Sequence, residues 1–364
     1  MKFVFGCGGT GGHIVPAIAI AKRIQKLGHE CLFIGNRDSM ESRLVPEAGF
    51  SFAGIHVQKL YRKLSLSHLL FPFYLLSSTL RSITILKMFS AETVLCTGGF
   101  VSGPVALAAL LCRIPCYFHE SNSLPGITTK LFAPYLKATF ISFPGARKHL
   151  KKGNLIDSGV PIMERENDEG DFDFSKYGLS GTKPIILVTG GSQGSLAINN
   201  AIDKALDRIQ SMGFELIWQT GKTGYATFKA KHSSKTGLLM FDFSTKLTSL
   251  FPKAKIAICR AGALTLAELE HQALPAILIP LPSSAENHQF FNAQEQEKRG
   301  LAILLEQKHL NTETLCENIA YIDTHQADFH ARFKQLKPNT HAADIAQYLI
   351  NHLSDKEKDH VRQN

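Results

Sequence analysis

Five glycines and one histidine follow a short apolar run near the start of the chain, in the sequence GCGGTGGH at residues 6–13. Glycine accepts positive φ angles and lets another molecule approach the main chain closely. The helix expected next presents its positive N-terminal end at the same place, so the pattern predicts a site for a phosphate or a sugar. Because an imidazole titrates near neutrality, His13 is a candidate general base. The alternative is a histidine that caps this helix or hydrogen-bonds the loop.

Gly6, Gly8 and Gly11 also satisfy GxGxxG, a pattern typical of dinucleotide-binding domains. Such domains place an acidic residue at the tip of the second strand to bind the ribose hydroxyls. Here the second apolar run, CLFIG, ends in Asn36 and Arg37. We therefore expect no nicotinamide or flavin cofactor.

Strand-like and helix-like runs alternate along all 364 residues, which is typical of parallel sheets flanked by helices. The stretch KFVFGCGGTGGH, from residue 2, recurs in kind as PIILVTGGSQGS, from residue 184. Each combines an apolar strand, a glycine-rich turn and a long helix. The sequence predicts two Rossmann-like α/β domains, residues 1–160 and 161–339, with an acidic linker from Val160 to Lys176. We expect a C-terminal helix, about residues 340–364, to pack back on the first domain.

The charge is uneven, because residues 1–160 hold 18 Lys and Arg against 7 Asp and Glu, while the remainder holds 22 against 24. A basic half predicts an acidic partner. No RRM, zinc-finger or KH signature is present, so nucleic acid is not expected. The segment from Lys59 to Met88 is too broken to span a bilayer, but its basic and apolar residues fit an element lying on an anionic membrane. A pair of core helices explains the same pattern equally well.

The seven cysteines have no CxxC spacing and several lie in apolar runs, which favours reduced core residues of a cytosolic protein. No signal peptide is expected before the first strand. Asp171 and Asp173 form a DxD pattern, but no apolar strand precedes them and acidic runs are usually solvated. No other cluster has metal-ligand spacing, so we expect no metal.

Ligands of open parallel sheets bind beyond the carboxyl ends of the strands. Six polar or glycine-rich segments follow apolar runs in this way. They are GGTGGH (8–13), TGGFVSG (97–103), HESN (119–122), GGSQGS (190–195), RAGALTLAE (260–268) and ENHQFFNAQ (286–294). We expect them to line one cleft between the two domains.

In this order and spacing, the motifs resemble those of the MurG family, the membrane-associated N-acetylglucosaminyltransferases of bacterial peptidoglycan synthesis. The resemblance runs from Met1 to about Leu353. It implies the GT-B fold, in which two Rossmann-like domains with parallel sheets face each other across an inter-domain cleft. It also implies metal-independent, inverting transfer of N-acetylglucosamine from UDP-N-acetylglucosamine to the C4 hydroxyl of MurNAc. The acceptor would be undecaprenyl-diphospho-MurNAc-pentapeptide (lipid I), and the product lipid II.

The resemblance implies that the first domain binds the acceptor and the membrane, and that the second binds the donor. In the second domain it assigns Ser192 to a phosphate, Glu268 to the ribose hydroxyls and Gln289, beside His288, to sugar hydroxyls. Main-chain atoms near Phe243 and Ser244 would read the uracil, and the first turn of a helix would face the donor. The remaining implied contacts are Ala263, Leu264 and Thr265 in that turn, and Thr10, Gly11, Gly12 and Asn122 in the first domain.

Among the implied catalytic residues, His13 is the first candidate base and Glu120 the second. Members of the family usually carry an arginine after a GNPV turn, near the donor phosphates. In SGVPIMER the matching residue is Met163, and Arg165 follows two residues later. The sequence leaves open whether Arg165 takes that role.

The resemblance further implies a peripheral protein on the cytoplasmic face of the plasma (inner) membrane, with roles in cell-wall biogenesis, cell shape and cell division. Its implied partners are UDP-N-acetylglucosamine, lipid I, anionic lipid and other cell-wall synthesis proteins. Three other functions stay open from the sequence. They are another lipid-directed GT-B transferase, such as a diacylglycerol glycosyltransferase, a UDP-N-acetylglucosamine 2-epimerase, and a nucleotide-sugar sensor without turnover.

Overall fold

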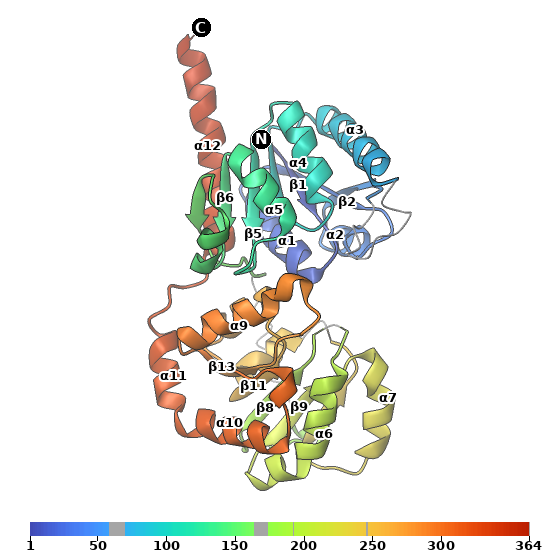
Figure 1. The fold of residues 1–364 in the computed structure, drawn as a ribbon, viewed down its shortest axis with the longest axis vertical. Helices are drawn as coiled ribbons and strands as arrows, with labels where there is room; N and C mark the ends of the chain where they lie inside the picture. Colours follow the sequence, from blue (N-terminus) through green and yellow to red (C-terminus); the bar gives the residue numbers. More distant parts are fainter. Residues whose placement is uncertain (58–69, 164–173, 192, 245–246, 364) are drawn as a thin grey trace. The chain divides into compact units, whose positions relative to one another are not determined.

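The structure, a computed structural model, describes residues 1–57, 70–163, 174–191, 193–244 and 247–363, and of 355–363 the backbone alone. The chain divides into two compact units. The first consists of Met1–Glu164 together with Asn339–Asn364, and the second of Arg165–Pro338. Each unit is an α/β structure built on its own parallel sheet (Figure 1).

Within the described residues, the first unit holds a seven-stranded sheet in the order β3-β2-β1-β4-β5-β6-β7. Its strands are β1 (Lys2–Cys7), β2 (Glu30–Asn36), β3 (Ser51–Ile55), β4 (Thr93–Gly98), β5 (Cys116–Glu120), β6 (Ala138–Ile141) and β7 (Leu155–Asp157). In β1, Phe3 pairs with Cys31 on one side and Thr93 on the other, both in parallel register. The strand order reverses between β1 and β4, which makes this the switch point where ligands of such sheets bind.

Helices cover both faces of this sheet. Phe3, Phe5 and Cys7 of β1 pack toward α1 (Gly11–Lys26), α2 (Glu41–Glu47) and α12 (His341–Gln363). Val4 packs toward the opposite face, which α3 (Phe71–Phe89), α4 (Ser102–Leu111) and α5 (Ile127–Phe132) cover. This alternation follows from the two-residue period of a strand, and it explains why the strands read as continuous apolar runs.

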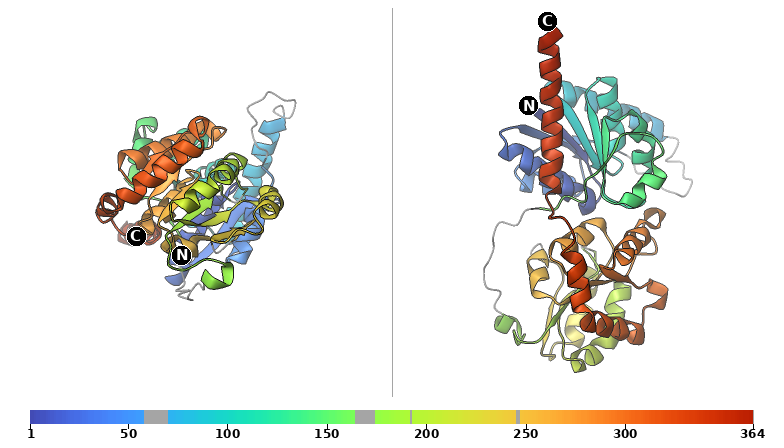
Figure 2. Two further views of the ribbon diagram at one scale, coloured as in Figure 1. Left: turned by 90° about the horizontal axis from the view of Figure 1, so that it is seen from below. Right: turned by 90° about the vertical axis from the view of Figure 1, so that its left-hand side faces the viewer.

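The helix α12 belongs to the core of the first unit although it ends the chain. Ile345, Ala346 and Leu349 are buried in one cluster with residues of α1. Figure 2 shows α12 running alongside the sheet of this unit. Asn339 Nδ2 donates a hydrogen bond to the carbonyl oxygen of Val160, so the outgoing and returning segments of the chain are tied to each other.

The second unit repeats the design with a six-stranded sheet, over its described residues, in the order β10-β9-β8-β11-β12-β13. Its strands are β8 (Ile185–Thr189), β9 (Glu215–Gln219), β10 (Leu238–Phe241), β11 (Ile256–Cys259), β12 (Ala276–Leu278) and β13 (Ala302–Leu304). Its helices are α6 (Leu196–Ser211), α7 (Lys222–Lys231), α8 (Ala263–His271), α9 (His288–Lys298), α10 (Thr312–Thr324) and α11 (Gln326–Phe333). Its switch point lies between β8 and β11. The predicted α/β class, with a Rossmann-like sheet in each unit, is confirmed.

The helix α3 distributes its residues in an unusual way. Its buried residues include Ser78, Thr79 and Ser82, whose hydroxyls donate to carbonyl oxygens one turn earlier in the helix. Its exposed residues include Phe73, Leu76 and Leu80, with exposed fractions of 71%, 59% and 55%. A surface helix of a globular protein normally shows the reverse pattern. One face of α3 is therefore packed and the other is apolar and open. The interpretation of this segment as a membrane-lying element stays a prediction.

The expected membrane element also includes residues 58–69, which lie outside the described residues. In the part of the chain that the structure describes, no helix combines the length and the apolar character needed to cross a bilayer. All seven cysteines are free thiols, and five of them are buried.

Candidate active site

Two hydrogen bonds join the first turn of α1, which follows β1, to the end of β4. His13 Nδ1 lies 2.9 Å from the carbonyl oxygen of Thr97, and Thr97 Oγ1 donates to the carbonyl oxygen of His13 across 2.7 Å. Because a carbonyl oxygen only accepts, Nδ1 carries the proton in this bond. In the neutral ring, Nε2 therefore holds the lone pair that a general base needs.

The imidazole of His13 lies directly against Gly98. A Cβ atom at residue 98 would stand 2.4 Å from His13 Nδ1, and the φ of Gly98 is +114°. Both the contact and the backbone angle exclude other residues. The glycine that ends β4 is thus explained by the histidine in the first turn of α1.

The start of α1 presents backbone donors beside this ring. Thr10 is the exposed N-cap residue, and its side chain makes no cap hydrogen bond. Its carbonyl oxygen accepts from the N–H of His13 at 3.0 Å and of Ile14 at 3.2 Å. The first-turn N–H groups of Gly11 and Gly12 therefore have no side-chain cap, and they suit a ligand rich in oxygen.

Glu120 and Asn122 lie at the end of β5 and in the loop after it. The Glu120 side chain is buried, and Oε1 accepts from the backbone N–H of Asn122 at 3.0 Å. Oε2 accepts from the N–H of Gly126 at 3.0 Å and from the hydroxyl of Thr129 at 2.7 Å. Both oxygens of this carboxylate therefore bond to its own loop.

His119, the first residue of the HESN motif, connects several parts of the first unit. Its Nε2 lies 3.0 Å from the carbonyl oxygen of Gly159, and its Nδ1 lies 3.3 Å from Ser121 Oγ. The Ser121 hydroxyl is also 3.5 Å from the carbonyl oxygen of Gly12, which lacks its usual helical partner because Pro16 has no N–H.

The pKa of His119 is lowered to about 4, chiefly by burial and to a smaller extent by the nearby His341 and His13, against the opposing effect of the Gly159 bond. The ring is therefore neutral near pH 7. The sequence analysis used the motif for Glu120 and Asn122 and missed this role of His119.

In the second unit, Arg260 stands beside the glycine-rich turn after β8. Its guanidinium donates to Ser195 Oγ at 2.6 Å, to Gln307 Oε1 at 2.8 Å and to two backbone carbonyl oxygens at 3.0 Å. Among the described residues, Arg260 has no carboxylate partner. Burial lowers the pKa of its guanidinium. Ser195 is also the N-cap of α6 and accepts from the N–H of Ile198. A guanidinium next to a helix N-terminus favours an anionic group such as a diphosphate.

The helix α8 begins directly after β11. Its N-cap residue, Gly262, has no side chain, so the first-turn N–H groups of Ala263, Leu264 and Thr265 have no side-chain cap. Glu268 lies half-buried further along the same helix. Burial, and secondarily the charge of Glu268, raises the pKa of Cys259 to about 12, which puts this carboxylate near the end of β11.

Two further loops of the second unit carry predicted site residues. Gln289 Oε1 accepts from the N–H of Leu281 at 3.0 Å, which leaves Nε2 as a donor with no other bond among the described residues. His288 Nδ1 bonds the carbonyl oxygen of Ala285 at 2.8 Å. The N–H of Ser244 donates to the side-chain oxygen of Gln219 at 3.1 Å, and Gln219 also bonds Thr189 at 3.0 Å. Gln219 was missed, although a buried amide at the end of an apolar strand is a detectable signal.

Some predicted residues cannot be placed. Ser192, Arg165, Asp171 and Asp173 lie outside the described residues. Met163, which replaces the family arginine, packs against the core of the first unit. Among the described side chains, no group of three or more His, Cys, Asp or Glu residues forms a metal-ligating cluster.

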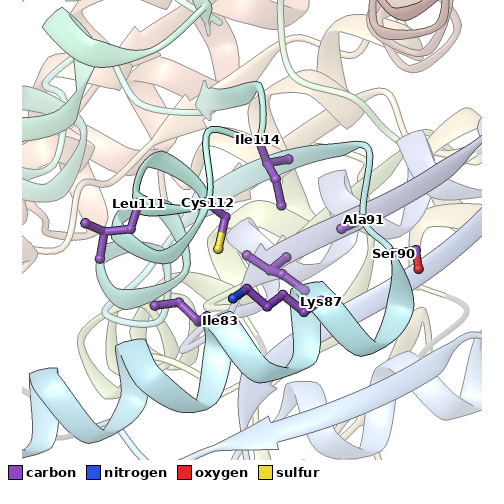
Figure 3. Close-up of a pocket in the computed structure, with 8 residues that line it drawn as sticks. Ile83, Lys87, Ser90, Ala91, Leu111, Cys112 and Ile114 are labelled. Carbon is purple, nitrogen blue, oxygen red and sulfur yellow. The ribbon is translucent and has the colours of Figure 1, made fainter.

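A pocket of about 470 Å³ lies elsewhere in the first unit (Figure 3). Residues from the C-terminal ends of α3 and α4 line it, among them Lys87 and Cys112, together with Ala91 and Ile114 just before β4 and β5. These residues lie at the amino-terminal edge of the strands. The pocket is therefore at the opposite edge of the sheet from the loops described above.

The chain has two α/β units, and each is built on a parallel sheet with a glycine-rich turn at its switch point. This is the fold of the GT-B class of glycosyltransferases. The chain matches the glycosyltransferase family 28 N-terminal domain over residues 3–141 and the family 28 C-terminal domain over residues 185–349. The chain belongs to glycosyltransferase family 28, and the prediction of a glycosyltransferase is confirmed.

Two relatives share the name UDP-N-acetylglucosamine–N-acetylmuramyl-(pentapeptide) pyrophosphoryl-undecaprenol N-acetylglucosamine transferase. The protein of Caldanaerobacter subterraneus subsp. tengcongensis is 36% identical over 334 residues, which cover 88% of this chain and 91% of that protein. The protein of Flavobacterium psychrophilum is 34% identical over 360 residues, which cover 96% and 97%. The crystal structure of Acinetobacter baumannii MurG shares the fold, with a TM-score of 0.76 at 24% identity over 96% of this chain and 99% of that one. The resemblance to the MurG family is confirmed.

The low pKa of His119 predicts a pH dependence of stability. Its pKa is about 4 when folded and about 6.5 when unfolded, so between these values the unfolded chain binds a proton that the folded chain does not. The free energy of unfolding should fall by about 2 kcal/mol from pH 7 to pH 5 on this account. His119→Gln keeps a donor toward Gly159 without titrating. Urea unfolding at both pH values should show a smaller loss in the variant, and equal losses would contradict the assignment.

Proposed function

We propose that this protein transfers N-acetylglucosamine from UDP-N-acetylglucosamine to the C4 hydroxyl of MurNAc in lipid I, producing lipid II and UDP. The shared name of the relatives supports this reaction. The observation that carries this proposal is the contrast between the equivalent glycine-rich turns of the two units. The turn of the first unit leads to His13, whose Nε2 holds a lone pair. The turn of the second unit lies beside the Arg260 guanidinium, which has no carboxylate partner in the described part of the chain.

The donor is assigned to the second unit, residues 165–338. The diphosphate would lie at the turn after β8, where the start of α6 and the charge of Arg260 favour an anion. The resemblance to the MurG family assigns Ser192 to a phosphate. The open N–H groups of Ala263, Leu264 and Thr265 would bind the donor, and Glu268 the ribose hydroxyls. His288 and the Gln289 amide suit sugar hydroxyls, and the main chain near Ser244 suits the uracil.

The acceptor is assigned to the first unit. His13 Nε2 would take the proton of the C4 hydroxyl as its oxygen bonds to C1 of the donor sugar. The bond from C1 to the UDP oxygen breaks with inversion, and the electron pair leaves on the diphosphate. Thr10, Gly11, Gly12 and Asn122 would contact the sugar hydroxyls, while His119 and Glu120 hold the surrounding loops.

The test of this function is an assay of lipid II formation from purified protein, labelled UDP-N-acetylglucosamine and lipid I. We expect product with lipid I and none with diacylglycerol. Because Arg260 supplies positive charge at the diphosphate, turnover should persist in excess EDTA. Sugar transfer to diacylglycerol, or donor turnover without any acceptor, would instead indicate another lipid glycosyltransferase or an epimerase.

A pair of variants separates the two halves of the site. His13→Ala should lower kcat by about 10²–10⁴ because the base is lost, and should leave UDP affinity unchanged. Glu268→Ala should weaken UDP binding roughly tenfold or more, because the ribose hydroxyls lose a charged acceptor. Calorimetry with UDP and kinetics at saturating lipid I measure both effects. Near-normal kcat in the His13 variant would transfer the role of base to Glu120.

We further propose that α3 docks the first unit on the cytoplasmic face of the plasma (inner) membrane, where lipid I is embedded. Phe73, Leu76 and Leu80 expose apolar surface while hydroxyls of the same helix are buried, and such a surface is unfavourable in water. The exposed cations Arg81 and Lys87 lie on the same helix. Each cation near anionic lipid contributes about 1 kcal/mol of attraction. Other cell-wall synthesis proteins remain proposed partners.

Replacing Phe73, Leu76 and Leu80 together with Ser should abolish co-sedimentation with anionic vesicles, because these side chains insert at the interface. The UDP affinity should not change. Leu27→Ser is the matched control, since Leu27 is 53% exposed but lies at the end of α1. Vesicle binding by the triple variant equal to that of the control would show that α3 is not the docking element.

A further inference from the structure

Glu41, the first residue of α2, lies beneath the glycine-rich loop of the first unit. Its exposed fraction is 0%. Oε2 accepts from the backbone N–H of Gly9 at 3.2 Å, and Oε1 accepts from the backbone N–H of Asn36 at 2.9 Å. No cation pairs with this carboxylate among the described residues. Two main-chain donors, from the loop after β1 and from the end of β2, hold it in place.

Two glycines leave the space that Glu41 fills. A Cβ atom at residue 8 would lie 2.4 Å from Glu41 Oε1, and one at residue 35 would lie 2.5 Å from Glu41 Cγ. Either side chain would displace the carboxylate. Gly8, in the glycine run that opens the chain, therefore serves an internal side chain and not only a visiting ligand.

The same network reaches a third strand. Asn36 Oδ1 accepts from the N–H of Val57, which follows β3, at 3.1 Å, and Asn36 Nδ2 donates to Ser39 Oγ at 3.1 Å. The ends of β1, β2 and β3 are thus connected through Glu41 and Asn36. A buried carboxylate is unfavourable unless its hydrogen bonds are satisfied, so this one is best explained by the geometry that it maintains.

The equivalent turn of the second unit has the opposite electrostatic character. There the N–H of Gly191 donates to the neutral hydroxyl of Thr189 at 3.1 Å, and Arg260 brings a positive charge. In the first unit, the charge of Glu41 adds to burial in raising the pKa of Cys7. The turn above Glu41 is therefore less favourable for an anion than the turn beside Arg260.

We propose that Glu41 is a positioning residue that holds the first glycine-rich loop so that Thr10, Gly12 and His13 meet the acceptor in one geometry. This inference rests on the proposed function, in which the loop receives the acceptor hydroxyl. Glu41 touches no reacting atom. It acts through Gly9, and a displacement of the loop by about 1 Å is enough to lower a rate by about 10²-fold.

The test is Glu41→Gln, which keeps the shape of the side chain. In either orientation of the amide, one of the two N–H groups faces an NH₂ donor and loses its acceptor. We expect kcat at saturating lipid I to fall at least tenfold in a variant that still folds, with unchanged KM for UDP-N-acetylglucosamine. Hydrogen exchange of the Gly9 amide or of the Asn36 amide should accelerate. The matched control is Glu47→Gln, the same change at an exposed residue of α2.

A folded Glu41→Gln protein with kcat within twofold of the wild type, or with Gly9 and Asn36 amides that are both as protected as in the wild type, would overturn the proposal. If this variant does not fold, Glu41→Asp replaces it, since the carboxylate stays but its reach shortens by one methylene. A folded Glu41→Asp protein with wild-type kcat would be equally adverse. Failure of the wild type to form lipid II would refute the proposed function instead. The comparison of hydrogen exchange between the wild type and the variant would still test whether Glu41 stabilises the loop.

Discussion

The reciprocal hydrogen bonds between His13 and Thr97 are the interaction on which the first unit's site depends. They connect the first turn of α1 to the end of β4, and the helices that follow β1 and β4 pack on opposite faces of the sheet. The bond at Nδ1 orients the imidazole and determines its tautomer, and Gly98 makes room for the ring. This contact therefore determines both the orientation of the imidazole and which of its nitrogens is protonated. The neighbouring loops are held in shape by their own hydrogen bonds. Glu120 contributes through its carboxylate, and His119 through Ser121 and Gly159.

The two units share one backbone design but place different charges at the equivalent turn. Each has a glycine-rich turn between its first strand and the helix that follows, at the switch point of the sheet. In the first unit a buried carboxylate, Glu41, takes an N–H of the turn, whereas in the second a hydroxyl does so and Arg260 adds a positive charge. The backbone supplies donors in both units, and the side chains beneath decide whether an anion is favoured.

The order of the elements along the chain differs from their grouping in the two cores. The helix α12 ends the chain but completes the core of the first unit through Ile345, Ala346 and Leu349. Where the chain leaves that unit, Gly159 bonds His119, and where it returns, Asn339 bonds Val160. Burial keeps His119 neutral near pH 7, so the same histidine supports the site loop and the exit of the chain. The site and the connection between the units therefore share one buried polar network.

The sequence by itself determined the α/β class, the two repeated strand, turn and helix segments, and the tips where site residues gather. These follow from short-range rules, because strand periodicity and turn chemistry are local and the carboxyl ends of parallel strands share one edge. Only the tertiary structure decided that Glu41 lies under Gly9 and that Arg260 meets Ser195. It also decided that α3 exposes Phe73, Leu76 and Leu80 and buries Ser78, Thr79 and Ser82. Those contacts join residues far apart in the chain, so they depend on which strands pair. The helical spacing of apolar residues is the same for a packed face and an open one, so burial was decided only when α3 packed against its neighbours.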